Sequence, residues 1–95
     1  MREIKAYIKP HKLSDVLMVL KAENFVKGVS VSEVRGFGKG TRNNLNDLQE
    51  HVKIETVCED ADAEKIAALI KSKAHTGLIG DGWIFITDVK STIKI

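Results

Sequence analysis

The strongest constraint on the fold is a unit that occurs twice in the sequence. Residues 3–9 and residues 52–58 each alternate between apolar and polar side chains, and each stretch is followed by apolar residues at helical spacing. The two helical stripes are Leu13, Val16, Leu17 and Leu20, and then Ala63, Ile66, Ala67, Ile70 and Ala74. Period two is typical of a half-buried strand and the i, i+3, i+4, i+7 spacing of an amphipathic helix, so each unit predicts a strand followed by a helix.

Two further segments have the composition of strands. Residues 29–34 are rich in β-branched side chains and lead into Gly-Phe-Gly, and residues 83–89 begin with four consecutive apolar residues. We expect the first helix to end near Asn24, and Asp60 or Asp62 can cap the second. The resulting order, βαββαβ, predicts an α+β ferredoxin-like sandwich, in which a four-stranded antiparallel sheet carries both helices on one face.

The size of the chain and the position of the helices predict association. The 95 residues fit a single domain over residues 1–95, and a chain this short buries only part of the surface that its unfolded form exposes. Two helices cover one face of the sheet, so apolar residues on the other face, such as Tyr7 or alternate members of Ile84, Phe85 and Ile86, need another subunit to cover them.

Charge and composition exclude several partners. Fifteen Lys and Arg residues are interleaved with thirteen Asp and Glu residues, which leaves no basic footprint for nucleic acid. No stretch approaches the ~20 consecutive apolar residues of a membrane span, so we expect no direct membrane insertion. The single cysteine, Cys58, cannot form an internal disulfide, and the first residues lack the apolar core of a signal peptide. We therefore expect a cytoplasmic location.

Two glycine clusters are candidates for an anion site. Gly36-Phe37-Gly38-Lys39-Gly40 follows the second predicted strand, and Gly77-x-x-Gly80-Asp81-Gly82 precedes the fourth. Glycines allow successive backbone amides to converge on an anion such as phosphate, because no Cβ blocks the approach. Neither cluster matches a P-loop or a dinucleotide-binding fingerprint, and each is also compatible with a structural turn.

A long polar segment separates the two central strands. Residues 39–51 exceed the usual connection of about four to six residues, and loops of this length are commonly functional. Leu45 and Leu48 within it are not explained by solvation. We interpret the segment as a protruding regulatory loop whose leucines anchor a partner, and a plain hairpin connection is the alternative.

No catalytic constellation is visible. Cys58 most simply fills the core. His11, His51 and His75 lack the spacing of metal ligands, so we predict no metal site from them. The acidic residues near residue 60 have no partnered His or Ser. We therefore predict a protein that is not an enzyme.

Four segments together resemble the PII signal-transduction family: Ile-Lys-Ala-Tyr-Ile-Lys-Pro at 4–10, Val-Ser-Glu-Val-Arg-Gly-Phe-Gly at 31–38, Val-Lys-Ile-Glu at 52–55 and Thr-Gly-Leu-Ile-Gly-Asp-Gly-Trp-Ile-Phe at 76–85. The resemblance covers nearly the whole chain in the right order. It implies a homotrimeric signal-transduction protein with an adenine nucleotide (ATP, ADP or AMP) in the clefts between subunits. It also implies a loop that docks on a membrane transporter or a metabolic enzyme.

The resemblance also implies which residues form the sites. Ser30 and Val57 correspond to contacts with the adenine, and the phosphate side corresponds to Gly36, Phe37, Gly38 and Lys39. The adjacent subunit would add Gly80, Asp81 and Gly82, with Trp83 and Lys94 at two further positions of the site. The partner-binding loop would present Arg42, Leu45 and Leu48.

The chain departs from the family pattern at several of these positions. Typical members have lysines where His51 and Trp83 stand, an arginine where Lys94 stands, and a second arginine beyond the position of Ile95. The loop is shorter than usual and has no tyrosine to modify. Fewer cationic donors predict weak or altered nucleotide binding, and Trp83 could instead offer a stacking surface. Gly40 replaces a glutamine that helps to bind Mg²⁺ and 2-oxoglutarate, so no Mg²⁺ ligand carries over there and we expect no 2-oxoglutarate sensing.

Two alternatives share the predicted topology. A trimeric copper-tolerance-like protein would use His11, His51, His75 and Cys58 to bind a divalent metal. An acylphosphatase-like enzyme would need an arginine-bearing phosphate loop after the first strand, where this chain has Lys9-Pro10-His11.

Overall fold

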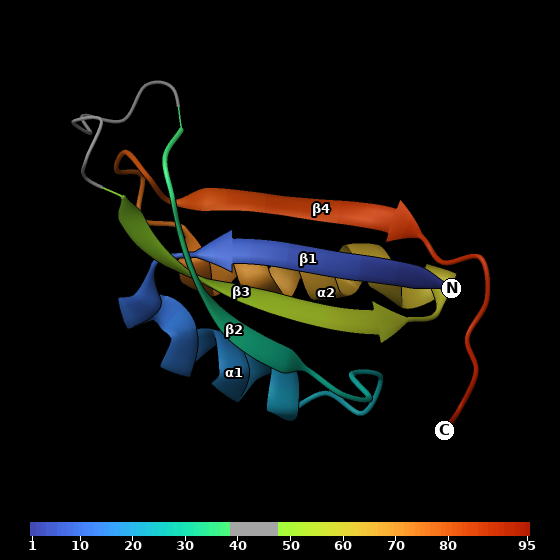
Figure 1. The fold of residues 1–95 in the computed structure, drawn as a ribbon. Coiled ribbons are helices and arrows are strands. Elements are labelled where there is room, and N and C mark those ends of the chain that lie inside the picture. The colour runs from blue at the N-terminus through green and yellow to red at the C-terminus, as the bar shows by residue number, and fades with distance from the viewer. Residues whose placement is uncertain (39–47) are drawn as a thin grey trace.

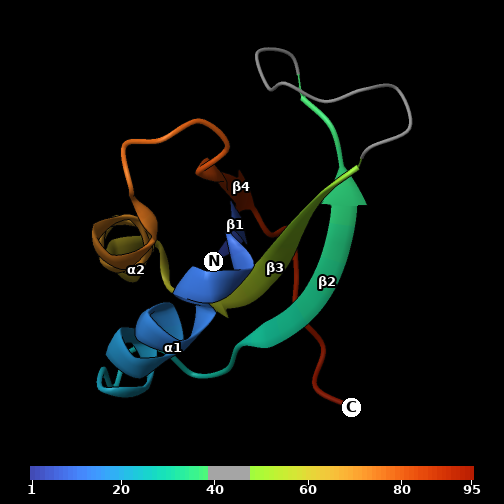
Figure 2. The same ribbon diagram turned by 90° about the vertical axis from the view of Figure 1, so that its left-hand side faces the viewer.

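A computed structural model describes residues 1–38 and 48–95 of the chain and contains one sheet and two α-helices. The strands are β1 (Arg2–Ile8), β2 (Ser30–Gly36), β3 (Gln49–Cys58) and β4 (Gly82–Asp88). A 3₁₀ turn, η1 (Pro10–Lys12), leads into α1 (Leu13–Lys21), and α2 (Asp60–Ala74) follows β3. The strand order is β2-β3-β1-β4 with every pairing antiparallel, and both helices lie on the same side of the sheet (Figures 1 and 2). The predicted ferredoxin-like fold is confirmed.

The core lies between the two central strands and the helices. Every second residue of β1 and β3 is buried, and these residues pack against the apolar stripes of α1 and α2. Cys58 is one of them, with 3% of its surface exposed, so the prediction that it fills the core is confirmed. The fully buried large side chains are Ile4, Ile8, Val16, Leu20, Ile54, Ile66 and Ile70.

The prediction for the loop extended too far along the chain. The predicted loop covered residues 39–51, but β3 begins at Gln49, so residues 49–51 belong to a strand. These polar residues pair with the end of β2, where Gly36 is opposite Gln49 and Val34 is opposite His51. Backbone hydrogen bonding to a neighbouring strand outweighs the weak strand propensity of such residues. Residues 39–47 lie outside the described part of the chain, and α1 ends at Lys21, three residues before the expected end.

The face of the sheet away from the helices is mixed in character. On β4, Ile84 and Ile86 pack against the core, whereas Trp83 and Phe85 lie on the opposite face, 75% and 49% exposed. Tyr7 on β1 contacts Phe85 edge to face, with ring centroids 6.2 Å apart. Lys53 and Glu55 on β3 share this face and form an ion pair at 3.3 Å. The open face therefore has an aromatic strip beside β4 and charged residues at its centre.

Candidate functional site

One cavity brings the two glycine clusters together within a single chain. It has a volume of about 480 Å³ and lies where β2 ends, β3 begins and the turn before β4 approaches them (Figure 1). Its lining residues are Tyr7, Val34, Arg35, Gly36, Phe37, Gly38, Gln49, His51, Ile79, Gly80, Asp81, Gly82 and Trp83. Its volume falls within the range of about 300–1,000 Å³ that is usual for small-molecule sites.

Asp81 holds the turn before β4 in shape. Its carboxylate accepts hydrogen bonds from the amides of Thr76 and Gly77, both at 2.9 Å, and from the hydroxyl of Thr76. Lys9, at the end of β1, lies 3.1 Å from the same carboxylate and 3.2 Å from the Thr76 hydroxyl. The hydroxyl and amide of Thr76, followed by the amide of Gly77 and by Lys9, hold the pKa of Asp81 well below its ordinary value. Asp81 thus positions the turn, because its oxygens already have donors within the chain.

The glycines of this turn are required by the fold itself. The backbone has positive φ at Gly77, Gly80 and Gly82, a conformation that residues other than glycine rarely adopt. A Cβ on Gly82 would stand 1.7 Å from the carbonyl oxygen of Tyr7, and one on Gly80 would stand 2.6 Å from Nε2 of Gln49. The structural interpretation of the second cluster is therefore correct for its glycines, whatever else the turn binds.

The first cluster is different. A Cβ on Gly36 or on Gly38 would meet nothing within 4 Å, and neither residue has positive φ. Within the described part of the chain, neither packing nor backbone conformation requires glycine at these positions. A requirement for glycine there would come from something outside the chain that approaches the backbone closely.

The turn presents backbone donors to the cavity. Within the described residues the amides of Ile79 and Gly80 have no hydrogen-bond partner, whereas that of Leu78 donates to the Thr76 hydroxyl at 3.1 Å. Adjacent unpaired amides are the donors of an anion-binding nest. His51 lies 2.8 Å from the carbonyl oxygen of Gly80 through Nε2, so that nitrogen is the donor, and it ties β3 to the turn.

Sequence reasoning missed two contributors to this cavity. Arg35 lines it and is its second basic group among the described residues, beside His51. Arg35 directly precedes Gly36 in the sequence, and this position beside a glycine cluster could have identified it as a site residue. Lys9 supports it indirectly through Asp81, and no local pattern predicts a contact between residues 67 positions apart, as Lys9 and Thr76 are.

Ser30 and Val57 lie elsewhere. They line a separate cavity of about 260 Å³, together with Glu3, Gly28, Glu55 and Thr56. Ser30 begins β2 and Gly36 ends it, so at about 3.3 Å per residue the two positions are about 20 Å apart. The expected division, with Gly36–Gly38 beside Ser30 and the turn 80–82 supplied by a neighbour, does not match the chain. Residues of both glycine clusters line one cavity, and Ser30 and Val57 line another.

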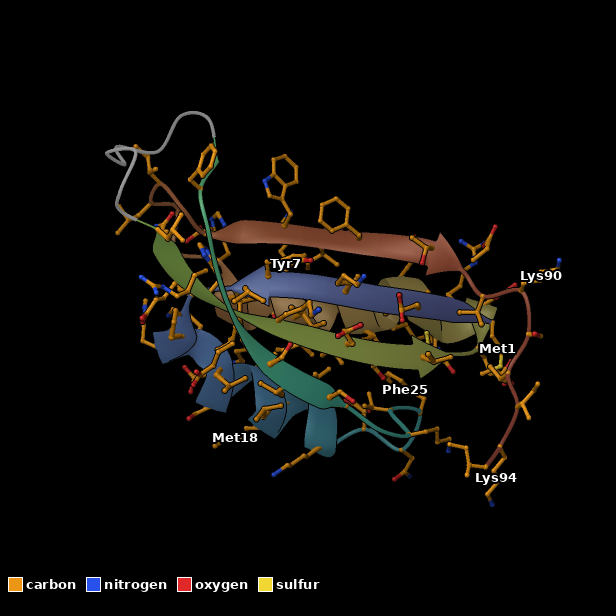
Figure 3. All side chains as sticks on the ribbon, in the orientation of Figure 1. Met1, Tyr7, Met18, Phe25, Lys90 and Lys94 are labelled. Carbon is orange, nitrogen blue, oxygen red and sulfur yellow. The ribbon has the colours of Figure 1, made fainter. Side chains whose placement is uncertain are left out.

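The remaining predicted site residues lie away from this cavity or outside the described part of the chain. Lys94 is in the C-terminal segment after β4, which has no regular structure. It lies far from Tyr7, which lines the cavity (Figure 3). Leu48 directly precedes β3 and is 43% exposed. Lys39, Arg42 and Leu45 lie outside the described residues.

Two features of the described residues bear on the alternatives. Residues 1–38 and 48–95 contain no group of three or more His, Cys, Asp or Glu side chains arranged to hold a metal ion. Burial, the largest cause, raises the pKa of the Cys58 thiol, which works against a metal-binding thiolate. The helices in this part of the chain are too short or too polar to cross a membrane.

Comparison with known proteins identifies the family. A family model described as "Nitrogen regulatory protein P-II" matches residues 1–95. The chain is 40% identical to the nitrogen regulatory protein P-II of Azospirillum brasilense over 103 residues, which cover all of this chain and 91% of the relative. The chain belongs to the P-II family. The proteins of the same name from Rhizobium meliloti and from Synechocystis are 37% and 38% identical, again with all of this chain and 91% of the relative covered.

Membership of the P-II family confirms the resemblance and gives the chain a regulatory role in signalling. The alignments run over 103 or 104 residues, whereas the P-II chain described here has 95, so it lacks eight or nine residues that these relatives carry within the aligned region. This shortfall agrees with the prediction of a shortened chain.

We expect Asp81→Asn to lower the free energy of unfolding and to flatten its dependence on pH. Because the pKa of Asp81 is lower in the folded chain than its unfolded value of about 3.9, its contribution is complete above that value and declines as the pH falls toward the folded pKa. The loss in the variant should therefore be large at pH 7 and small near pH 2, as measured by urea unfolding at one fixed chain concentration. Asp15→Asn is the control, because the exposed carboxylate of Asp15 has no ion pair or hydrogen bond within the described residues. Parallel pH curves for the wild-type chain and Asp81→Asn would contradict the assigned role.

The two glycine clusters should respond differently to alanine. Gly82→Ala should lower the free energy of unfolding by at least about 2 kcal/mol, because the new methyl group meets the Tyr7 carbonyl at a positive φ. Gly36→Ala should change it by less than about 0.5 kcal/mol, because its surroundings are open. Equal losses in thermal and urea unfolding would show that Gly36 is also a structural glycine.

Proposed function

We propose that this P-II protein is a homotrimeric regulator that binds an adenine nucleotide, ATP, ADP or AMP, in the clefts between its subunits. It regulates a membrane transporter or a metabolic enzyme through the loop that joins β2 to β3, and it works in the cytoplasm. We propose no reaction for it and no contact with nucleic acid.

One observation carries the nucleotide part of the proposal. Gly36 and Gly38 lack a Cβ where the described residues leave open space. They border a cavity that the side chain of Arg35 also lines, together with the amides of Ile79 and Gly80, which have no partner in this part of the chain. Backbone donors, a guanidinium and room for close approach are the features of a phosphate site. A bound phosphate group would explain the glycines by lying against their backbone.

The division of the site between two cavities supports assembly. We call the cavity lined by Gly36, Gly38 and Gly80 the phosphate cavity. A nucleotide that reaches from it to Gly28, Ser30 and Val57 would have to span about 20 Å within one chain, which is further than a mononucleotide extends. If the adenine side comes from a neighbouring subunit instead, both cavities are used at each interface. The open face of the sheet, with its aromatic strip beside β4, provides the surface on which neighbouring subunits would pack.

The few basic groups of the phosphate cavity favour a modest affinity for nucleotides and a ligand with one or two phosphate groups. Its basic groups among the described residues are Arg35 and His51, and Asp81 adds an acidic group whose partners are inside the chain. Each charge-assisted hydrogen bond contributes about 1.5–3 kcal/mol, so a site with Trp83 in place of a cation holds a triphosphate weakly. ADP or AMP is the better match to these donors.

The loop is the proposed route from the site to a partner. It joins β2 to β3, and its two ends, Gly36–Gly38 and Gln49, both line the phosphate cavity. A ligand in the cavity therefore touches both ends of the loop and can change how Arg42, Leu45 and Leu48 meet a partner. Leu48 is the one of these three within the described residues, and it is exposed.

Calorimetric titration of the purified protein with ATP, ADP and AMP tests the nucleotide site. We expect binding of at least one of the three and an affinity about tenfold lower for Gly36→Ala, because the added methyl group fills space that the phosphate would occupy. Ser32→Ala, in the middle of β2 and away from both cavities, is the matched control and should bind as the wild type does. No binding of any of the three nucleotides would refute the proposal.

A mixing experiment tests whether each site is shared by two subunits. Gly36→Val should block the phosphate side and Ser30→Trp the adenine side, so each variant alone should bind no nucleotide. Trimers assembled from both variants always contain an interface at which an intact phosphate side faces an intact adenine side, so mixing should restore binding. Sedimentation velocity checks that each variant is still a trimer. If mixed trimers stay inactive, the two sides belong to one subunit and the proposed division is wrong.

A further inference from the structure

The phosphate cavity also carries two exposed aromatic side chains that the P-II chain does not use for its own packing. Phe37 and Trp83 both line the cavity and are both 75% exposed. Phe37 follows β2 and Trp83 lies on β4, and these are the two edge strands of the sheet, so the rings approach the cavity from opposite sides. Large apolar side chains with this exposure beside a cavity are typical of a binding surface.

Neither ring has a partner within the described residues. The aromatic pair in this part of the chain is Tyr7 with Phe85, and the cation over a ring is Lys65 over Phe25. The indole N–H of Trp83 donates no hydrogen bond to the described residues. Phe85, on the same strand and face, contacts Tyr7 and is 49% exposed, so Trp83 is the more exposed of the two rings.

The geometry points to a dinucleotide as the ligand, in which a second planar heterocycle stacks on Trp83 and Phe37 beyond the phosphates. This inference rests on the proposed function, which gives the adenine to the neighbouring subunit and the phosphates to the amides of Ile79 and Gly80. Apart from these amides, Arg35 and His51, the cavity is lined by the aromatic rings of Phe37 and Trp83 and by no further basic side chain among the described residues. A cavity of about 480 Å³ has room for a ring in addition to a diphosphate.

A stacked ring explains the choice of side chains better than a third phosphate does. An additional phosphate needs cationic or amide donors, and an indole ring provides one N–H and a large π-face. Stacking of a base on an aromatic side chain changes affinity by roughly one to two orders of magnitude, and any planar heterocycle can provide it. The expected ligand class therefore has two heterocycles joined through a diphosphate.

Titration with NAD⁺, ADP-ribose and ADP tests this inference. ADP-ribose has the adenine, the diphosphate and the second ribose of NAD⁺ but lacks the second ring, so it isolates the contribution of that ring. We expect NAD⁺ to bind about tenfold more tightly than ADP-ribose, and ADP-ribose to bind about as tightly as ADP. Trp83 is the single tryptophan of the chain, so its emission reports directly on stacking, and NAD⁺ should quench it far more than ADP-ribose does.

Variants assign the effect to the two rings. Trp83→Leu should reduce the affinity for NAD⁺ to that for ADP-ribose and leave the affinity for ADP unchanged. Phe37→Leu should act in the same direction, and because Phe37 lies outside the sheet and is exposed, this variant keeps the test available if Trp83→Leu fails to assemble. Met18→Ala, which removes an exposed apolar side chain from α1 away from the cavity, is the control and should bind all three ligands as the wild type does.

The outcomes separate this inference from the proposed function. Equal affinities for NAD⁺ and ADP-ribose would overturn the dinucleotide and leave nucleotide binding standing. Emission of Trp83 that is already blue-shifted in the free protein and does not respond to NAD⁺ would show that a neighbouring subunit covers the ring, which also overturns it. If NAD⁺, ADP-ribose and ADP all fail to bind, the proposed nucleotide site falls together with the inference.

Discussion

The constraint from which the architecture follows is that two helices cover only one face of a four-stranded sheet. The central strands β1 and β3 send Ile4, Ile8 and Ile54 into the covered face, which gives the chain a single core. The opposite face keeps Tyr7 and Phe85 in contact with each other and leaves Trp83 to solvent. Because exposed aromatic surface is unfavourable in water, the same constraint that builds the core also creates a surface suited to a ligand or to a second subunit.

The candidate site is built before any ligand arrives. Asp81 binds Lys9, Thr76 and Gly77 through its carboxylate, and this fixes the turn. Within residues 1–38 and 48–95, two amides of that turn, those of Ile79 and Gly80, have no partner and line the cavity. The close approach of Gly82 to Tyr7 then places the turn directly beside the end of β1. A ligand therefore meets donors that are already ordered, so its binding energy is not spent on arranging them. On the other wall, Gly36 and Gly38 leave the backbone accessible.

Much of the fold was predictable from the sequence, because it depends on local patterns. The period-two alternation of residues 3–9 and 52–58 predicted which side chains of β1 and β3 are buried, and the stripes of the two helices predicted the rest of the core. The start of β3 was not predictable in this way. Gln49 to His51 are polar residues that become strand because β2 lies beside them, which is information from tertiary structure and not from composition.

The candidate site was predictable in its parts and not in its arrangement. The glycine clusters are visible as composition, but which of them share a cavity depends on the strand order β2-β3-β1-β4 and on contacts such as Lys9 with Asp81. The separation of Ser30 from Gly36 follows from the length of β2, and it moves the adenine side to another subunit in the proposed assembly.

The structure also bears on His51 and Trp83, the two positions at which the resemblance to the family implies a lysine. At His51 the lost cation is exchanged for a hydrogen bond to the carbonyl of Gly80, which strengthens the frame of the cavity. At Trp83 it is exchanged for an exposed ring on the cavity wall. Both changes shift the site from long-range electrostatic attraction toward contacts of short range, which depend on the shape of the ligand. Salt screens charge interactions but has little effect on stacking, so the proposed regulator would distinguish ligands by their rings more than by their number of phosphates.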